Sequence, residues 1–153
     1  MGRSYRVLLV SSSGGVLLDL LALRPWWQRH RPVWVAVRAP DTEVALAGQR
    51  VHWRPELSAG TKLRVLPATW QALRLLRAER PDVIVSAGTG VAVGFFLAAK
   101  LLRVPTLWLE TFNMTGSAGA AAGVCSRLAG AVLVQRPALL ATRRRAVLIG
   151  ELY

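Results

Sequence analysis

One short unit occurs twice in this chain: an apolar run rich in β-branched residues, then a glycine-containing polar loop, then an apolar helical segment. The two copies begin at Val7 and Val83, and their loops span residues 11–15 and 86–90. In a parallel sheet the loops that follow the strands share one rim, where ligands of open α/β sheets bind. Glycine lets a ligand approach the backbone closely, and the N–H groups at a helix start favour anions. The two loops therefore predict a site for a phosphorylated ligand.

Strand-like and helix-like segments alternate along the whole chain, which predicts an α/β fold with a parallel sheet covered by helices. Strands are expected at residues 6–11, 33–38, 51–54, 83–86, 106–110, 131–135 and 146–149. Helices are expected at residues 15–28, from residue 40, at 67–80, at 91–103, and up to about Gly130. The length of 153 residues predicts one domain, residues 1–153.

Charge and hydropathy narrow the possible partners. The chain carries 20 basic and 8 acidic residues, a net charge of +12, which attracts phosphorylated ligands, anionic lipid or nucleic acid. Mean hydropathy is +0.36, apolar for a soluble protein, yet no uncharged run reaches the roughly 18–20 residues that span a bilayer. The N-terminus shows no cleavage site of the signal-peptide type. We expect a cytosolic protein whose surface lies on a membrane or on a partner.

Several site types are missing from the sequence. A single cysteine and two histidines provide neither a disulfide nor a zinc cluster, so no metal is expected. There is no G-x-G-x-x-G fingerprint and no Walker lysine, which argues against dinucleotide and P-loop sites. We therefore expect no cofactor.

Three further features are candidates for function. Glu110 ends a predicted strand on the same rim as the glycine loops, where it could act as a base, bind sugar hydroxyls or accept bonds from backbone amides. Trp26 and Trp27 lie among arginines, an arrangement typical of a membrane interface or of a packed helix end. The residues Phe95, Phe96 and Leu97 belong to an apolar helix that either contacts a membrane or is buried against the sheet.

An ordered set of motifs resembles a known family. The motifs are VLLVSSSGG at 7–15, ERPDVIVSAGTGVAVGFF at 79–96, LETF at 109–112, LVQRP at 133–137 and VLIGELY at 147–153. Together they resemble the bacterial PssD-type exopolysaccharide glycosyltransferase subunits, which are similar to asparagine-linked glycosylation protein fourteen. The resemblance extends over essentially the whole chain.

This resemblance implies a Rossmann-like domain with helices on both faces, equivalent to the N-terminal, acceptor-side half of a split MurG-like GT-B enzyme. A separate subunit would bind the UDP-sugar donor, and the acceptor would be a polyprenyl-diphosphate-linked saccharide at the cytoplasmic face of the membrane. Transfer would be inverting and independent of metal, as part of polysaccharide biosynthesis. The matching positions imply acceptor or phosphate binding by Ser13, Gly14, Gly15, Gly88, Thr89 and Gly90, catalysis by Glu110, and membrane contact by Trp26, Trp27, Phe95, Phe96 and Leu97.

One position departs from the family pattern. A histidine usually follows the Ser-Gly-Gly of the first loop, and here Val16 stands in its place. Two alternatives to a catalytic subunit therefore stay open. The chain could be a noncatalytic scaffold that recruits a soluble glycosyltransferase to the membrane. It could also be a basic nucleic-acid-binding domain, although its arginines are dispersed and no nucleic-acid-binding motif is present, so we expect no nucleic-acid partner.

Overall fold

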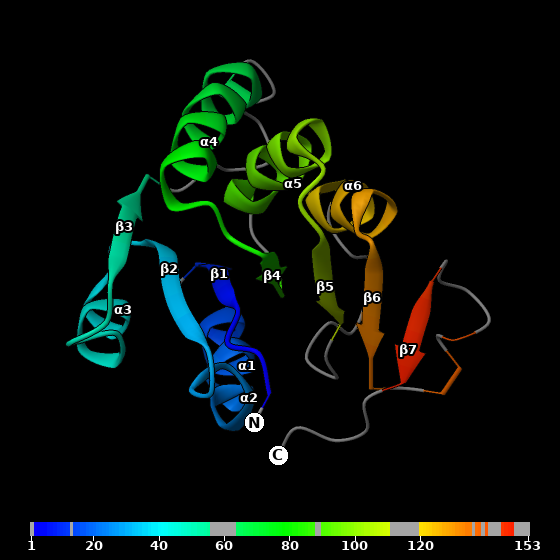
Figure 1. The fold of residues 1–153 in the computed structure, drawn as a ribbon, viewed down its shortest axis with the longest axis horizontal. Helices are drawn as coiled ribbons and strands as arrows, with labels where there is room; N and C mark the ends of the chain where they lie inside the picture. The colour runs from blue at the N-terminus through cyan, green and yellow to red at the C-terminus, as the bar shows by residue number, and fades with distance from the viewer. Residues whose placement is uncertain are drawn as a thin grey trace.

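The computed structural model describes residues 2–12, 14–55, 64–87, 90–110, 120–135, 137–138, 140 and 145–148, and the side chains of 120–123 are not among them. Strands and helices alternate (Figure 1). The strands are β1 (Arg6–Ser11), β2 (Arg31–Val37), β3 (Val51–Arg54), β4 (Val83–Ser86), β5 (Thr106–Glu110), β6 (Ala131–Val134) and β7 (Ala146–Leu148). The helices are α1 (Gly15–Ala22), α2 (Arg24–Trp27), α3 (Pro40–Ala45), α4 (Val65–Glu79), α5 (Gly90–Leu102) and α6 (Ala120–Leu128).

The strands form one parallel sheet in the order β3-β2-β1-β4-β5-β6-β7. The order reverses between β1 and β4, as in doubly wound folds, where ligands bind at this switch point. In register, Val10 lies opposite Ser86, and Ser86 lies opposite Trp108. The ends of β1, β4 and β5 therefore lie side by side, and the predicted α/β fold with a Rossmann-like parallel sheet is confirmed.

Helices cover both faces of the sheet, as predicted (Figure 1). The larger core lies between the sheet and α4, α5 and α6, with Phe96 and Trp108 among its buried members. The smaller core lies on the face of α1, α2 and α3, and it includes Trp27 and Trp34. Strand residues alternate between the two cores because successive side chains of a strand point to opposite faces.

The first predicted helix, residues 15–28, is divided in two. α1 ends after Ala22 and α2 begins at Arg24, with Leu23 between them. Pro25 explains the break, because proline lacks the N–H that would continue the hydrogen bonds of α1 and its ring clashes with the carbonyl four residues earlier. The break turns Trp27 into the smaller core, where its Nε1 donates a hydrogen bond to the Leu20 carbonyl at 3.0 Å.

The apolar helix α5 is a central core element. Its side chains pack on the sheet, and Phe96 is only 1% exposed. Gly94 allows α4 to come close, because a Cβ atom there would lie 3.3 Å from the backbone carbon of Ala68. The uniform hydrophobicity of this helix therefore reflects burial between the sheet and its helical neighbours.

An ionic cluster ties α4 to the start of β3. Glu79 is buried, and its Oε1 accepts hydrogen bonds from Arg50 Nη2 at 2.6 Å and lies 2.8 Å from His52 Nε2. Burial alone would raise the pKa of Glu79, but the His52 hydrogen bond and the Arg50 charge outweigh it and hold the pKa below its ordinary value. Glu79 also uses its main-chain carbonyl to accept a hydrogen bond from Arg6. The cluster joins three segments of the fold.

We expect Glu79→Gln to lower the free energy of unfolding at pH 7 by about 1–3 kcal/mol, because Arg50 and His52 lose their carboxylate. A lowered folded-state pKa gives stability above the unfolded-state pKa of about 4.3, and that stability is lost as pH falls through the folded-state value. The difference between wild type and variant should therefore shrink below about pH 5. Urea unfolding from pH 7 to pH 3 measures it.

The control for this experiment is Glu43→Gln. Glu43 forms an exposed pair with Arg38 at 3.5 Å, and such pairs contribute about 0–1 kcal/mol. Equal losses of unfolding free energy in the two variants would show that the buried cluster stabilises the fold no more than an exposed ion pair does.

Candidate functional site

The carboxyl ends of β1, β4 and β5 form the rim that the sequence predicted as the site. Ser86, at the end of β4, is buried and its Oγ donates a hydrogen bond to the Val10 carbonyl at 2.8 Å. This bond fixes the ends of the two strands relative to each other. Since adjacent strands lie about 4.8 Å apart, β1 and β5 are separated by about 10 Å across β4. The first loop and Glu110 thus lie within reach of one ligand.

The first glycine loop is already bound by a carboxylate of the protein itself, that of Asp41. Gly14 precedes α1 with φ 75° and ψ −136°, a conformation that essentially only glycine adopts. Its N–H donates a hydrogen bond to Asp41 Oδ2 at 2.8 Å, from the first turn of α3. Gly15 is exposed, and Ser13 lies outside the described residues. A phosphate at the Gly14 N–H would have to displace Asp41, which the sequence did not predict because the two residues are 27 positions apart.

The second glycine loop leads into α5. Gly90 is the first residue of this helix and is partly exposed, so the helix N-terminus faces the rim. Gly88 and Thr89 lie outside the described residues, and their predicted role in phosphate binding stays a prediction.

Glu110 is the last residue of β5 and is 4% exposed. It lies opposite Val134 in β6. By alternation along the strand its side chain lies on the same sheet face as Trp108, the face covered by α4, α5 and α6. The predicted position of Glu110 on the rim is confirmed, and its role stays a prediction.

Three of the five residues predicted to contact a membrane belong to the core, and this part of the prediction is wrong. Trp27 packs edge to face on Trp34, with ring centroids 5.6 Å apart, and Phe96 packs in the same way on Trp108 at 5.9 Å. Phe95 is also buried. Burial of large aromatic side chains stabilises the fold and leaves these rings no outer surface that could contact a bilayer. Leu97 is partly buried, and Trp26 is exposed enough to remain available.

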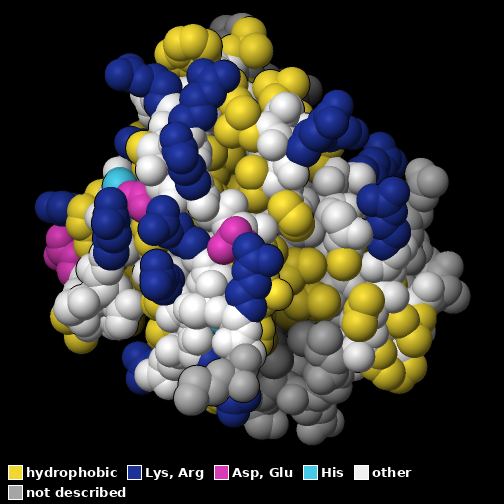
Figure 2. Space-filling view, viewed as in Figure 1, with side chains coloured by type: hydrophobic (Ala, Val, Ile, Leu, Met, Phe, Trp, Pro, Cys, Tyr) yellow, Lys and Arg dark blue, Asp and Glu magenta, His cyan; other side chains and the backbone are white. Residues whose placement is uncertain are grey.

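A different apolar surface is exposed on α4. Leu66 and Trp70 lie one turn apart and are 81% and 60% exposed. Arg74 follows one turn later, and Arg77 follows in the next turn, both exposed. Figure 2 shows hydrophobic and basic side chains side by side at the end of the molecule where α4 lies. We call these four residues the α4 surface. The spacing of Leu66, Trp70 and Arg74 in the sequence could have indicated it.

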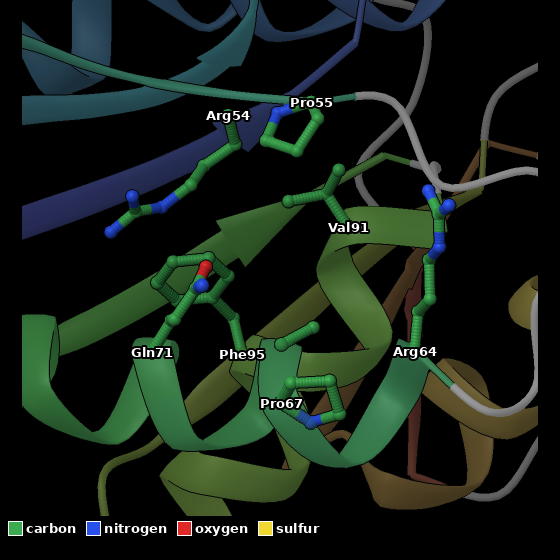
Figure 3. Close-up of a pocket in the computed structure, with 8 residues that line it drawn as sticks. Arg54, Pro55, Arg64, Pro67, Gln71, Val91 and Phe95 are labelled. Carbon is green, nitrogen blue, oxygen red and sulfur yellow. The ribbon is translucent and has the colours of Figure 1, made fainter.

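A cavity of about 290 Å³ lies between the end of β3, the start of α4 and the start of α5. Its lining residues are Arg54, Pro55, Arg64, Pro67, Ala68, Gln71, Val91 and Phe95. In Figure 3, Arg54 and Arg64 lie at opposite ends, with Val91 between them and Gln71 and Phe95 below. The cavity opens beside the carboxyl rim, because Arg54 ends β3 and Val91 belongs to the first turn of α5. The sequence did not predict this cavity.

Other chemistry is limited in the part of the chain that the structure describes. Cys125 is buried in the larger core, and burial raises the pKa of its thiol to about 12, so it is no nucleophile. Among the described residues, no group of three or more histidine, cysteine or acidic side chains could hold a metal ion. Within the same residues, no helix has the length and hydrophobicity needed to cross a bilayer.

Comparison with known proteins relates the chain to MurG-type glycosyltransferases. Over 88 residues it is 36% identical to the UDP-N-acetylglucosamine–N-acetylmuramyl-(pentapeptide) pyrophosphoryl-undecaprenol N-acetylglucosamine transferase of Nitrosospira multiformis, covering 58% of this chain and 24% of that enzyme. Acinetobacter baumannii MurG superposes with a TM-score of 0.70 at 23% identity, over 87% of this chain and 42% of that one. No family model matches the chain.

The fold is shared more widely than the sequence. The Staphylococcus aureus MnaA–UDP structure superposes with a TM-score of 0.75 at 13% identity, over 97% of this chain and 45% of that one. The fold is thus the Rossmann-like one of GT-B glycosyltransferases and of UDP-N-acetylglucosamine 2-epimerases. The chain spans no more than about a quarter of the curated relatives that it matches and less than half of these solved structures.

Proposed function

We propose that this chain is the acceptor-binding half of an inverting glycosyltransferase, which transfers a sugar from a UDP-sugar to a polyprenyl-diphosphate-linked saccharide in polysaccharide biosynthesis. The observation that carries the proposal is the 36% identity over 88 residues with a transferase whose name specifies a pyrophosphoryl-undecaprenol acceptor. The match in fold to MurG over 87% of this chain supports it.

The proposal includes a second protein. The ordered motifs that resemble those of PssD-type subunits favour a heterodimer in which a separate subunit would bind the UDP-sugar, and residues 1–153 would form one acceptor-side domain. Two complementary halves are needed because the acceptor and the donor must meet with their reacting atoms in contact.

Within this half, Glu110 is the proposed general base. It would take the proton of the acceptor hydroxyl as that oxygen attacks the anomeric carbon and UDP leaves. The glycine loops, with Ser13, Gly14 and Gly15 in the first and Gly88, Thr89 and Gly90 in the second, would hold polar groups of the acceptor. The N-terminus of α5 favours a negatively charged group at the second loop.

The test is reconstitution with the donor-binding subunit that co-purifies from the membrane fraction. We expect transfer of labelled sugar from a UDP-sugar to a polyprenyl-diphosphate-linked saccharide only when both subunits are present. Recovery of nucleic acid, or transfer by the partner alone at the full rate, would contradict the proposal.

We further propose that the enzyme acts at the cytoplasmic face of the membrane and that the α4 surface is the membrane contact. Leu66 and Trp70 offer apolar area, and Arg74 and Arg77 add charge for anionic lipid. Trp26 and Leu97 are not part of this surface.

We expect the double variant Leu66→Ser and Trp70→Ser to bind vesicles of anionic phospholipid on the order of 10²–10⁴-fold more weakly, because each of the two side chains contributes about 1.5–3 kcal/mol when the bilayer buries it. Sedimentation with vesicles measures the loss. The matched control is Val44→Ser, which removes a residue of similar exposure from α3 on the other sheet face. If the Val44→Ser control loses as much vesicle binding as the double variant, membrane association does not depend on the α4 surface.

A noncatalytic scaffold is the second candidate, and two observations favour it. Val16 replaces the histidine of the family pattern, and Asp41 already occupies the Gly14 N–H. A scaffold would bind membrane and partner equally well but would contribute no group to the reaction.

A further inference from the structure

We propose that the cavity between β3, α4 and α5 binds the diphosphate and the first isoprene units of the lipid-linked acceptor. The inference rests on the proposed function and assigns a place to one part of the substrate. The cavity combines two arginine side chains with apolar walls, and it lies next to the rim where the reaction is proposed to occur.

The charge of the cavity is unbalanced in favour of an anion. Arg54 and Arg64 line it, and none of the described residues that line it is acidic. The Nε atom of Arg54 is buried and has no hydrogen-bond partner among the described residues, although buried polar groups are normally paired. By contrast, Arg50, the residue before β3, is paired with Glu79 at 2.6 Å. A guanidinium for which the described residues provide no carboxylate partner is suited to bidentate binding of phosphate oxygens.

The cavity suits a diphosphate better than the first glycine loop does. At the first loop, the Asp41 carboxylate already accepts the Gly14 N–H at 2.8 Å, and its negative charge repels a phosphate. At the cavity, Val91 brings the first turn of α5 to the lining, and the N-terminus of that helix adds partial positive charge. Of these two places at the rim, the cavity beside α4 and α5 is therefore the one with the more positive charge.

The remaining walls suit the isoprenyl part. Pro55, Pro67, Ala68 and Phe95 are apolar, and Gln71 adds one amide that can donate to an oxygen. Pro67 follows Leu66 directly, so the lining of the cavity adjoins the α4 surface along the chain. A lipid chain that leaves the cavity along α4 would reach Leu66 and Trp70, where the protein is proposed to contact the bilayer.

The test is titration calorimetry of the full chain with farnesyl diphosphate, a short isoprenyl diphosphate. Inorganic pyrophosphate, farnesol and UDP-N-acetylglucosamine are the comparison ligands. We expect farnesyl diphosphate to bind at least about tenfold more tightly than pyrophosphate or farnesol, since only it uses both the arginines and the apolar walls. Equal affinity for pyrophosphate, or displacement of farnesyl diphosphate by UDP-N-acetylglucosamine, would overturn the proposal.

Variants locate the binding. We expect Arg54→Gln and Arg64→Gln each to weaken farnesyl diphosphate binding about tenfold or more, and Gln71→Glu to abolish it by placing a carboxylate in the cavity. The control Arg127→Gln removes the same charge from α6, outside the lining, and should stay within about twofold. Thermal unfolding verifies the fold, and Gln71 is exposed, so its substitution leaves the core intact. Equal weakening by Arg127→Gln, or none by the two lining variants, would overturn the assignment.

A transfer assay with the donor subunit separates this inference from the proposed function. If the pair transfers sugar and the lining variants leave the acceptor KM unchanged, the cavity assignment fails alone. If the lining variants weaken farnesyl diphosphate binding but the wild-type pair transfers no sugar, the cavity assignment holds and the proposed function fails.

Discussion

Glu110→Gln is expected to lower the transfer rate of the reconstituted pair by about 10²–10⁴-fold, the usual contribution of a positioned general base. Glutamine has nearly the same shape, so the end of β5 and its register with Val134 should be kept. The amide cannot accept the proton of the acceptor hydroxyl. The loss should therefore appear in kcat, measured with saturating donor and acceptor.

Two measurements distinguish this role from a structural one. Glu110 is 4% exposed, so its substitution could also alter the fold, and urea unfolding of the variant reports that directly. Glu110→Asp, which keeps a carboxylate, should recover part of the lost kcat, which a purely structural role would not explain. If Glu110→Gln transfers sugar at the wild-type rate, Glu110 is not the base and the scaffold alternative gains. Glu43→Gln, an exposed acid on α3, should leave the rate unchanged.

The strands of the sheet could be predicted almost residue by residue, because the sequence pattern of each short segment determines where its strand begins and ends. β1, β4 and β5 have the predicted bounds because each is a mainly apolar run that ends at a polar residue, and β3, with the sequence VHWR, has them because Pro55 follows it. The break at Leu23 was missed because the apolar residues of Val16 to Leu23 and the tryptophans after them read as one helix. Pro25 was the available signal.

Burial of α5 could not be decided from its own residues. A helix that is apolar all round is equally compatible with a core and with a membrane, and only the neighbours distinguish the two. The close approach of α4 at Gly94 and the packing of Phe96 on Trp108 place the helix in the core. On α5 the exposed large apolar residue is Leu101, near the end of the helix, whereas the more amphipathic α4 exposes Leu66 and Trp70 one turn apart.

The site depends on contacts between distant segments, which no local pattern encodes. The Gly14 N–H meets Asp41 because β2 returns the chain to the same rim before α3 begins. The cavity joins Arg54, Gln71 and Val91 from three elements. A glycine loop read alone predicts an anion site, whereas the structure shows a carboxylate on one loop and, at the end of β3, a buried Arg54 Nε with no hydrogen-bond partner among the described residues.

Trp108→Ala is expected to lower the free energy of unfolding by about 3–5 kcal/mol, the range for removing a large buried aromatic side chain. Trp108 is fully buried in the centre of the sheet and packs on Phe96 at 5.9 Å, so the loss leaves a cavity that α5 and the sheet cannot fill without moving. Chemical unfolding at pH 7 measures the change.

A second variant at the same position, Trp108→Phe, tests the role of the indole N–H. The Nε1 of Trp108 is buried and finds no hydrogen-bond partner in the part of the chain that the structure describes, so phenylalanine removes an unsatisfied donor while it keeps a ring against Phe96. The cost of the smaller ring, about 1 kcal/mol or more, is then largely offset by the relief of about 1–3 kcal/mol. We therefore expect Trp108→Phe to be nearly as stable as wild type. A loss as large as that of Trp108→Ala would mean that the indole N–H has a partner in solution.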